Sequence, residues 1–78
     1  MLTVEGVVNA AKLMVSAPTM PYLIVVEDLR GWVQGWIETV VAHPDFSTYS
    51  PQWMEEQLAI RLALMVSEAN LRALTQVD

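Results

Sequence analysis

The amino-acid sequence predicts an all-α fold of three helices, in which a short first helix is followed by a long helical hairpin. Apolar residues recur at helical spacing in each of three stretches. Two proline-containing segments, residues 17–21 and 43–51, separate these stretches, and proline both ends helices and restricts the residue before it. With 78 residues, the chain is expected to form a single domain, residues 1–78.

Residues 3–16 predict the short first helix. Thr3 is a suitable N-cap because its hydroxyl can accept a hydrogen bond from an unpaired amide of the first turn. Polar residues such as Glu5 and Asn9 lie opposite the apolar side of the helical wheel. The apolar stripe, which is expected to face the core, consists of Val4, Val7, Val8, Ala11, Met14 and Val15.

Residues 21–43 predict the first arm of the hairpin. The β-branched stretch at residues 22–26 could also form a strand, but no second strand is evident to pair with its backbone. A helix is therefore the preferred interpretation, and Pro44 follows its expected end. One broad apolar face of this helix contains Val25, Val26, Leu29, Trp32, Val33, Trp36, Ile37 and Val40.

Residues 51–76 predict the second arm, with Ser50 as N-cap, Pro51 at the first helical position and a Glu68–Arg72 pair near the end. This helix carries two apolar stripes on nearly opposite sides. The first stripe is Leu58, Leu62, Met65, Val66, Ala69 and Ala73, and the second is Trp53, Ile60, Leu64 and Leu71. Either the second stripe contacts another chain, or the helix lies sandwiched between the other two.

The composition exceeds what a small domain can bury. Apolar residues make up 54% of the chain, and a domain of this length covers only a modest share of its surface. No Cys is present, so disulfides, thiol catalysis and Cys-based metal sites are excluded. Self-association is the remaining way to cover the surplus, and a homodimer about a two-fold axis is the expected form.

The formal net charge of −5 argues against two classes of partner. The four basic residues, Lys12, Arg30, Arg61 and Arg72, are scattered, whereas a phosphate backbone or an anionic membrane calls for clustered cations. We expect no direct nucleic-acid binding and no membrane binding. No targeting segment is evident, and the longest uncharged run, residues 13–26, is too short to span a bilayer, so a cytoplasmic location is expected.

A repeated Gly-Trp step lies in the middle of the second segment. Gly31 and Gly35 are four residues apart, and each glycine weakens a helix interior by about 1 kcal/mol relative to alanine. Such spacing lets another backbone approach closely, while Trp32 and Trp36 offer large anchors on a neighbouring face. Alternatively, the two indoles fill the core and the glycines relieve crowding.

The connection at residues 43–50 contains the single His with Asp45, Tyr49 and several hydroxyl residues, but no nucleophile elbow or phosphate-binding loop. Turn and capping roles are the preferred interpretation, so no enzymatic activity, cofactor or metal is expected. Among the methionines, Met14 and Met65 are assigned to the core, whereas Met20 and Met54 could lie in the core or on a binding surface.

These observations favour a small acidic protein-interaction module, such as an adaptor, inhibitor or regulator that occupies the surface of a partner protein. The expected anchors are Trp32, Trp36, Trp53, Ile60 and Leu64, with Gly31 and Gly35 as points of close helix packing. The alternative is a structural subunit of a homo-oligomeric assembly such as a viral or bacterial ring, whose neighbours would cover the same apolar faces.

Overall fold

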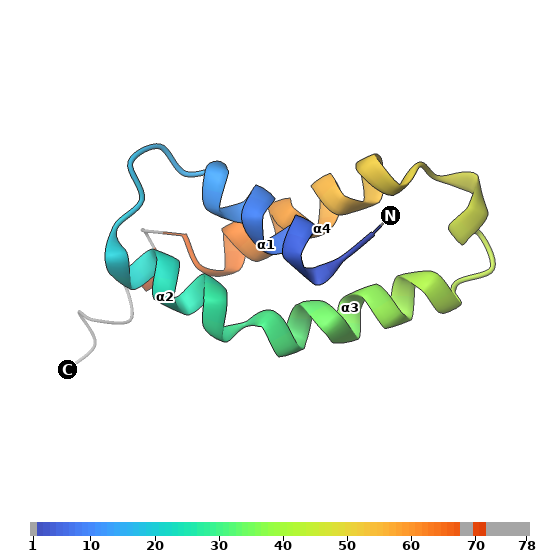
Figure 1. Ribbon diagram of the computed structural model, residues 1–78, viewed down its shortest axis with the longest axis horizontal. Coiled ribbons are helices and arrows are strands. Elements are labelled where there is room, and N and C mark those ends of the chain that lie inside the picture. The colour runs from blue at the N-terminus through green and yellow to red at the C-terminus, as the bar shows by residue number, and fades with distance from the viewer. Residues whose placement is uncertain (1, 68–69, 72–78) are drawn as a thin grey trace.

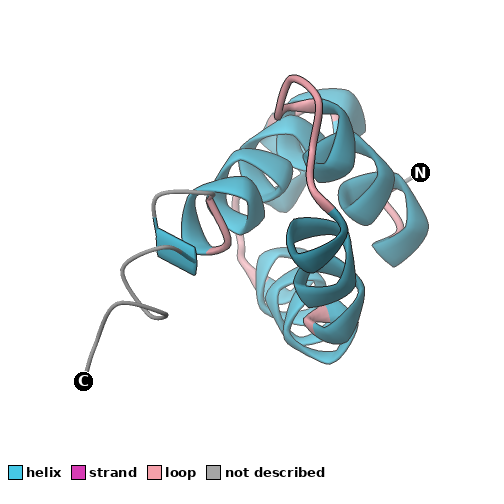
Figure 2. Ribbon diagram, turned by 90° about the vertical axis from the view of Figure 1, so that its left-hand side faces the viewer, coloured by secondary structure: helices cyan, strands magenta, loops and turns pink. Residues whose placement is uncertain are grey.

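The computed structural model describes residues 2–67 and 70–71, which contain four α-helices, one short 3-10 helix and no strand (Figures 1 and 2). α2 and α3 follow one another along one long edge, α4 returns along the other, and α1 packs mainly against α4 (Figure 1). The Cα atoms extend over 45 × 24 × 15 Å, so the bundle is elongated and flat. The predicted all-α class is confirmed, whereas the prediction of three helices is wrong. The helices are α1 Val4–Leu13, α2 Met20–Asp28, α3 Arg30–Ala42, η1 Phe46–Thr48 and α4 Pro51–Met65.

The first helix, α1, begins as the sequence indicates and ends three residues early. The Thr3 hydroxyl accepts a hydrogen bond of 3.0 Å from the amide of Gly6, which confirms the predicted N-cap. The helix ends at Leu13 rather than at residue 16. Ala17 takes a left-handed conformation with φ 54°, directly before Pro18. Because a residue before proline avoids the right-handed helical region, the chain turns here toward α2.

The second predicted helix is divided into α2 and α3. Thr19 caps α2 by accepting a hydrogen bond from the amide of Tyr22, and residues 22–26 are helical, which resolves the choice between strand and helix. The helix is interrupted at Leu29, whose φ of −90° and ψ of 11° leave the helical region. Gly31, a weak helix former, stands in the first turn after this break. The long arm is therefore a bent pair of helices.

The last helix, α4, starts at the predicted position and ends at Met65. The Ser50 hydroxyl accepts a hydrogen bond of 3.1 Å from the amide of Trp53, and Pro51 is the first helical residue, as predicted. The Asn70 side chain donates hydrogen bonds to the carbonyls of Leu64 (2.6 Å) and Met65 (3.3 Å). These bonds satisfy carbonyls that the end of the helix leaves unpaired. The predicted continuation of this helix is wrong at residues 66–67, which are described and not helical, whereas Ala69, Ala73 and the Glu68–Arg72 pair lie outside the described residues.

The core lies where α1 meets the other three helices. It contains Val7, Val8, Ala11, Tyr22, Val26, Val33, Ile37, Met54, Leu58, Ala59, Leu62 and Val66. Tyr22 is the largest fully buried side chain, and its hydroxyl donates a hydrogen bond of 3.0 Å to the Ala11 carbonyl. The phenol is therefore satisfied inside an otherwise apolar interior. The assignment of Met14 and Met65 to the core is wrong, since both are exposed; Met54 is buried and Met20 is exposed.

Ion pairs connect α1 to the break between α2 and α3. Glu27 accepts hydrogen bonds from Lys12 of α1 and from Arg30, and Arg30 also pairs with Glu5 of α1. Hydrogen bonds from Arg30 and then from Lys12 lower the pKa of Glu27 from its ordinary value of 4.5 to about 2. Bonding to Arg30 also lowers the pKa of Glu5, and both carboxylates raise that of Arg30. The two carboxylates thus hold the bent arm against α1.

Acidification is expected to weaken the fold through Glu27. Its pKa is lower in the folded chain than in the unfolded chain, so its stabilising contribution is fully present above pH 4.5 and is lost as the pH falls toward 2. The test is the free energy of unfolding, followed by circular dichroism at several pH values. Glu27→Gln should remove part of the dependence in this window. Glu38→Gln is the control, because Glu38 forms no ion pair with a described residue and glutamine can still accept the hydrogen bond from Gln34. An unchanged pH profile in Glu27→Gln would contradict this role.

Candidate functional site

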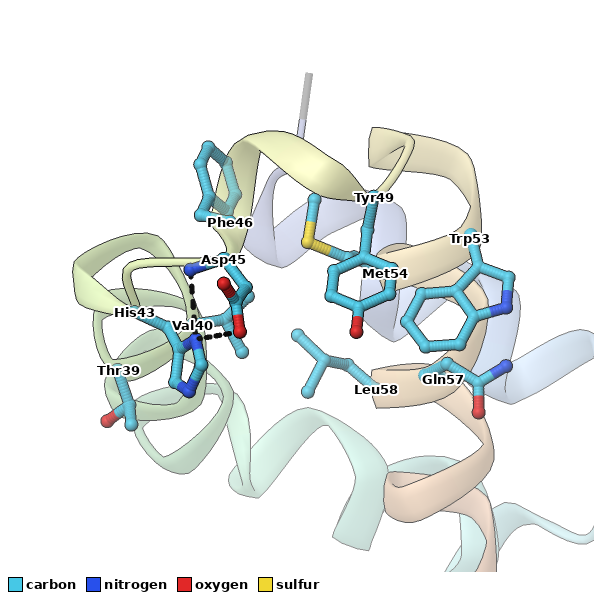
Figure 3. Close-up of a pocket in the computed structure, with 10 residues that line it drawn as sticks. All are labelled: Thr39, Val40, His43, Asp45, Phe46, Tyr49, Trp53, Met54, Gln57 and Leu58. Atoms are coloured by element: carbon cyan, nitrogen blue, oxygen red, sulfur yellow. Dashed lines mark hydrogen bonds and ion pairs between the residues drawn. The ribbon is translucent and has the colours of Figure 1, made fainter.

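A pocket of about 350 Å³ opens between the end of α3, the connection around η1 and the first half of α4 (Figure 3). The sequence places helix ends on both sides of it, because Pro44 follows α3 and Ser50-Pro51 starts α4. The two helices are joined here by a short connection rather than by packed side chains. The lining residues are Thr39, Val40, His43, Asp45, Phe46, Tyr49, Trp53, Met54, Gln57 and Leu58.

The pocket has an apolar floor and one aromatic wall. Met54 and Leu58 are buried and form its floor, where they continue into the core. On one side the rings of Tyr49 and Trp53 stack, with centroids 4.8 Å apart and an angle of 16° between their planes. Trp53 itself is 48% exposed. A guest side chain would therefore meet aromatic faces and aliphatic groups rather than water.

The opposite side of the pocket carries His43, Asp45 and Thr39, whereas Gln57 lies beside Trp53 (Figure 3). The Asp45 amide donates a hydrogen bond of 3.2 Å to His43 Nδ1, and Asp45 Oδ2 lies 3.9 Å from the same nitrogen. Asp45 Oδ2 is thus close to the imidazole, and the hydrogen bond from the Asp45 amide to the His43 side chain lies in the turn that follows α3. Both side chains are largely exposed. The pair gives the mouth of the pocket a polar edge, with one carboxylate facing solvent.

One face of α4 extends the pocket into a longer apolar surface. Trp53, Ile60 and Leu64 recur at helical spacing and are all exposed, Leu64 to 67%. The first stripe of the same helix is buried at Leu58, Leu62 and Val66, as predicted. No other described helix covers the exposed stripe, so α4 is not sandwiched between its neighbours. Leu71, assigned to the exposed stripe from the sequence, instead packs half-buried against the core.

The two indoles of the Gly-Trp repeat have different environments. Trp32 is 61% exposed, whereas Trp36 is half-buried against the core. The guanidinium of Arg61, on α4, lies 4.9 Å from the centre of the Trp36 ring, a cation–π contact that bridges α3 and α4. Trp36 therefore contributes to the fold, and Trp32 is available at the surface.

The glycines of this repeat meet no neighbour within the described chain. A Cβ atom built on Gly31 or Gly35 would have nothing within 4 Å, so neither glycine is needed to relieve crowding or to admit another described helix. Close packing against another chain stays a prediction. The glycine that does stand at a close approach is Gly6, where a Cβ would collide with the Glu55 carboxylate of α4 and lie 3.1 Å from the Thr3 hydroxyl. The sequence offered no signal for it, because the close neighbour comes from a distant helix.

We expect the double variant Gly31→Ala/Gly35→Ala to be more stable than the wild type, by about 0.5–1 kcal/mol per glycine, because alanine favours the helix and nothing obstructs its methyl group. Thermal unfolding measures the gain, with Gly6→Ala as the crowded counterpart that should gain less. A loss of stability in the double variant would mean that the glycines serve the isolated fold. A stabilised variant that no longer self-associates would indicate another chain packed on them.

The described surface is unevenly charged. Lys12 and Arg30 are engaged in the ion pairs with Glu5 and Glu27, and Arg61 lies over Trp36. By contrast, four carboxylates form no ion pair with another described residue: Asp28, Glu38, Glu55 and Glu56. These four carboxylates therefore give the described surface an acidic character.

A second apolar surface lies at the other end of the molecule, where α1 turns into α2 (Figure 1). We call it the Leu13 end, and it comprises Leu13, Met14, Met20 and Ile24. Leu13 is 85% exposed and Met20 66%. No charged residue occurs from position 13 to position 26. In the sequence, this run is recognisable only as uncharged. The exposure of its side chains depends on where α1 ends.

The fold and these surfaces define a small all-helical bundle with an aromatic-walled pocket. Comparison with protein-family models, with curated proteins and with solved structures finds no match for this chain. Among residues 2–67 and 70–71, no helix has the length and apolar character needed to cross a bilayer. The same residues contain no group of three or more His, Asp or Glu side chains positioned to hold a metal ion.

Proposed function

We propose that this chain is a small protein-interaction module that binds a partner through the pocket and the adjoining face of α4. The observation that carries the proposal is the exposure of Trp53, Ile60 and Leu64 along one helix face, next to an apolar pocket. Exposing these large apolar side chains forfeits the free energy of their burial, so a partner that covers the stripe would recover it.

The chemistry of the surface suits a protein partner. Tryptophan and tyrosine are enriched among residues that dominate binding energy, and Trp53 and Tyr49 stand side by side at the mouth of the pocket. Arg61 and Asp45 supply polar groups at the edges of the apolar area. Trp32 extends the surface along α3, whereas Trp36 acts indirectly by holding Arg61 in place.

A structural subunit is the second candidate, and one observation favours it. The Leu13 end is a separate exposed apolar surface, away from the pocket, so one copy offers two sites that neighbours could cover. The homodimer expected from the composition stays a prediction, as do the cytoplasmic location and the absence of enzymatic activity and of nucleic-acid or membrane binding.

A photo-crosslinking residue at position 57 tests the proposal in the native cell. Gln57 is exposed, lines the pocket and follows Trp53 by one helical turn. We expect one discrete cross-linked protein from this position, and none from the matched control at Glu38, which is exposed on α3 outside the pocket lining.

The cross-linked protein should disappear when Trp53→Ala and Leu64→Ser are introduced together, while circular dichroism shows the helices intact. Cross-linking that is the same at positions 57 and 38, or that survives both substitutions, would refute the proposed binding face.

A further inference from the structure

We propose that the pocket accepts the Leu13 end of a second copy of this chain. This inference rests on the proposed function, since it names the partner that occupies the same pocket. Two copies lying antiparallel would make the contact twice, with the Leu13 end of each copy in the pocket of the other.

The exposure of Leu13 leaves its whole side chain free to insert into an apolar pocket. Leu13 is the last residue of α1, it is 85% exposed, and no other large apolar side chain in the described residues is more exposed. Met20 starts α2 on the other side of the same turn and is also exposed. Leu13 and Met20 flank a turn that contains Ala17. The left-handed backbone of Ala17 gives the Leu13 end a defined shape.

The pocket has the size and the lining needed to hold side chains of the Leu13 end. Its volume of about 350 Å³ lies at the lower end of the range of about 300–1,000 Å³ found for ligand pockets, so it can hold more than one aliphatic side chain. The floor of Met54 and Leu58 and the wall of Tyr49 and Trp53 present apolar atoms to the guest. Leucine and methionine side chains match this lining in polarity.

Charge favours this pairing over a contact between identical surfaces. Copies with a formal net charge of −5 repel one another unless the contact avoids their carboxylates. The four side chains of the Leu13 end lie in a run of residues without any charge, so they themselves place no carboxylate in the pocket beside Asp45. A two-fold contact between two pockets would instead place two copies of Asp45 near each other.

The available area favours two contacts per pair of copies. The four exposed side chains of the Leu13 end present on the order of 400 Å² of apolar surface, comparable with the largest patch on an ordinary monomer. A standard interface buries about 800 Å² per partner. Since each copy contributes a Leu13 end to one contact and a pocket to the other, a reciprocal dimer approaches this size, whereas a single contact does not.

Sedimentation of the full chain and of two variants tests the contact. Wild-type protein should form a dimer as its concentration is raised, and Leu13→Asp and Trp53→Ser should each remain monomeric with an unchanged circular dichroism spectrum. Mixing the two variants should restore a weaker 1:1 dimer, because one copy still has its Leu13 end and the other its pocket. A Leu13→Asp variant that dimerises as strongly as the wild type would overturn the inference.

Engineered cysteines give a second measurement that does not depend on disrupting the pocket. The chain has no native Cys, so single-cysteine variants report one position each. Leu13→Cys mixed with Gln57→Cys should form a mixed disulfide faster than Leu13→Cys mixed with Glu38→Cys. Equal rates, together with a monomeric wild type, would refute the contact between copies. If position 57 still cross-linked another protein in cells, the proposed function would survive; if it did not, both would fail.

Discussion

Replacing Leu62 with alanine is expected to lower the free energy of unfolding by about 2–5 kcal/mol. Leu62 is fully buried in the last turn of α4, within the core that α4 forms with α1. The truncation removes buried methyl groups and leaves a cavity that the helices cannot fully close. A chain of 78 residues has a total stability of roughly 4–12 kcal/mol, so the variant should be close to unfolding.

Leu64→Ala is the matched control on the same helix, two residues further along. Leu64 is 67% exposed, and its truncation should change stability by no more than about 0.5 kcal/mol. Urea unfolding followed by circular dichroism measures both variants. Similar losses at the two positions would show that the second stripe of α4 is covered in solution by this chain or by another. Leu64→Ala should instead weaken partner binding, as expected of an anchor.

The second large effect is expected at Tyr22. Tyr22→Ala should cost about 3–5 kcal/mol, because the side chain is the largest one fully buried and joins α2 to α1. Tyr22→Phe keeps the ring and loses the hydrogen bond that the hydroxyl donates to the Ala11 carbonyl, so its cost should be about 1 kcal/mol. The difference between the two variants separates packing from hydrogen bonding.

Tyr49→Phe provides the control for Tyr22→Phe, since Tyr49 is largely exposed and its stacking on Trp53 does not need the hydroxyl. Its thermal unfolding should match that of the wild type. A Tyr22→Phe variant as stable as the wild type would mean that the buried hydroxyl contributes nothing net. A Tyr22→Ala variant that loses less than the phenylalanine variant would place the ring outside the core.

Local signals in the sequence predicted the starts of helices well. Thr3 and Ser50 cap α1 and α4 as expected, and Pro51 opens α4, because a cap depends on residues within one turn of each other. Helix breaks and ends were predicted less well. The interruption at Leu29, next to Gly31, and the end of α4 at Met65, whose carbonyl accepts a hydrogen bond from Asn70, are not encoded by the periodicity of apolar residues.

The candidate site was likewise predicted in part, for features that depend on local spacing. The apolar stripe of Trp53, Ile60 and Leu64 was predicted from spacing, whereas its exposure and the pocket beside it were not. The pocket requires α3 and α4 to be joined by a connection that leaves Val40 and Tyr49 on either side of a gap. Helical spacing also failed for Met14, which shares a wheel face with Val7 but lies beyond the last turn of α1.

By itself, the sequence determined that the chain is helical, where three of its helices begin, and which faces of those helices are apolar. These properties follow from dihedral preferences, capping and periodicity, which act over a few residues. Only the tertiary structure decided which apolar face is covered, that Gly6 rather than Gly31 stands at a close approach, and that Leu13 projects into solvent. Burial depends on how the helices pack together. Two apolar faces of one helix look alike in the local sequence, and packing against distant segments decides which of them is buried.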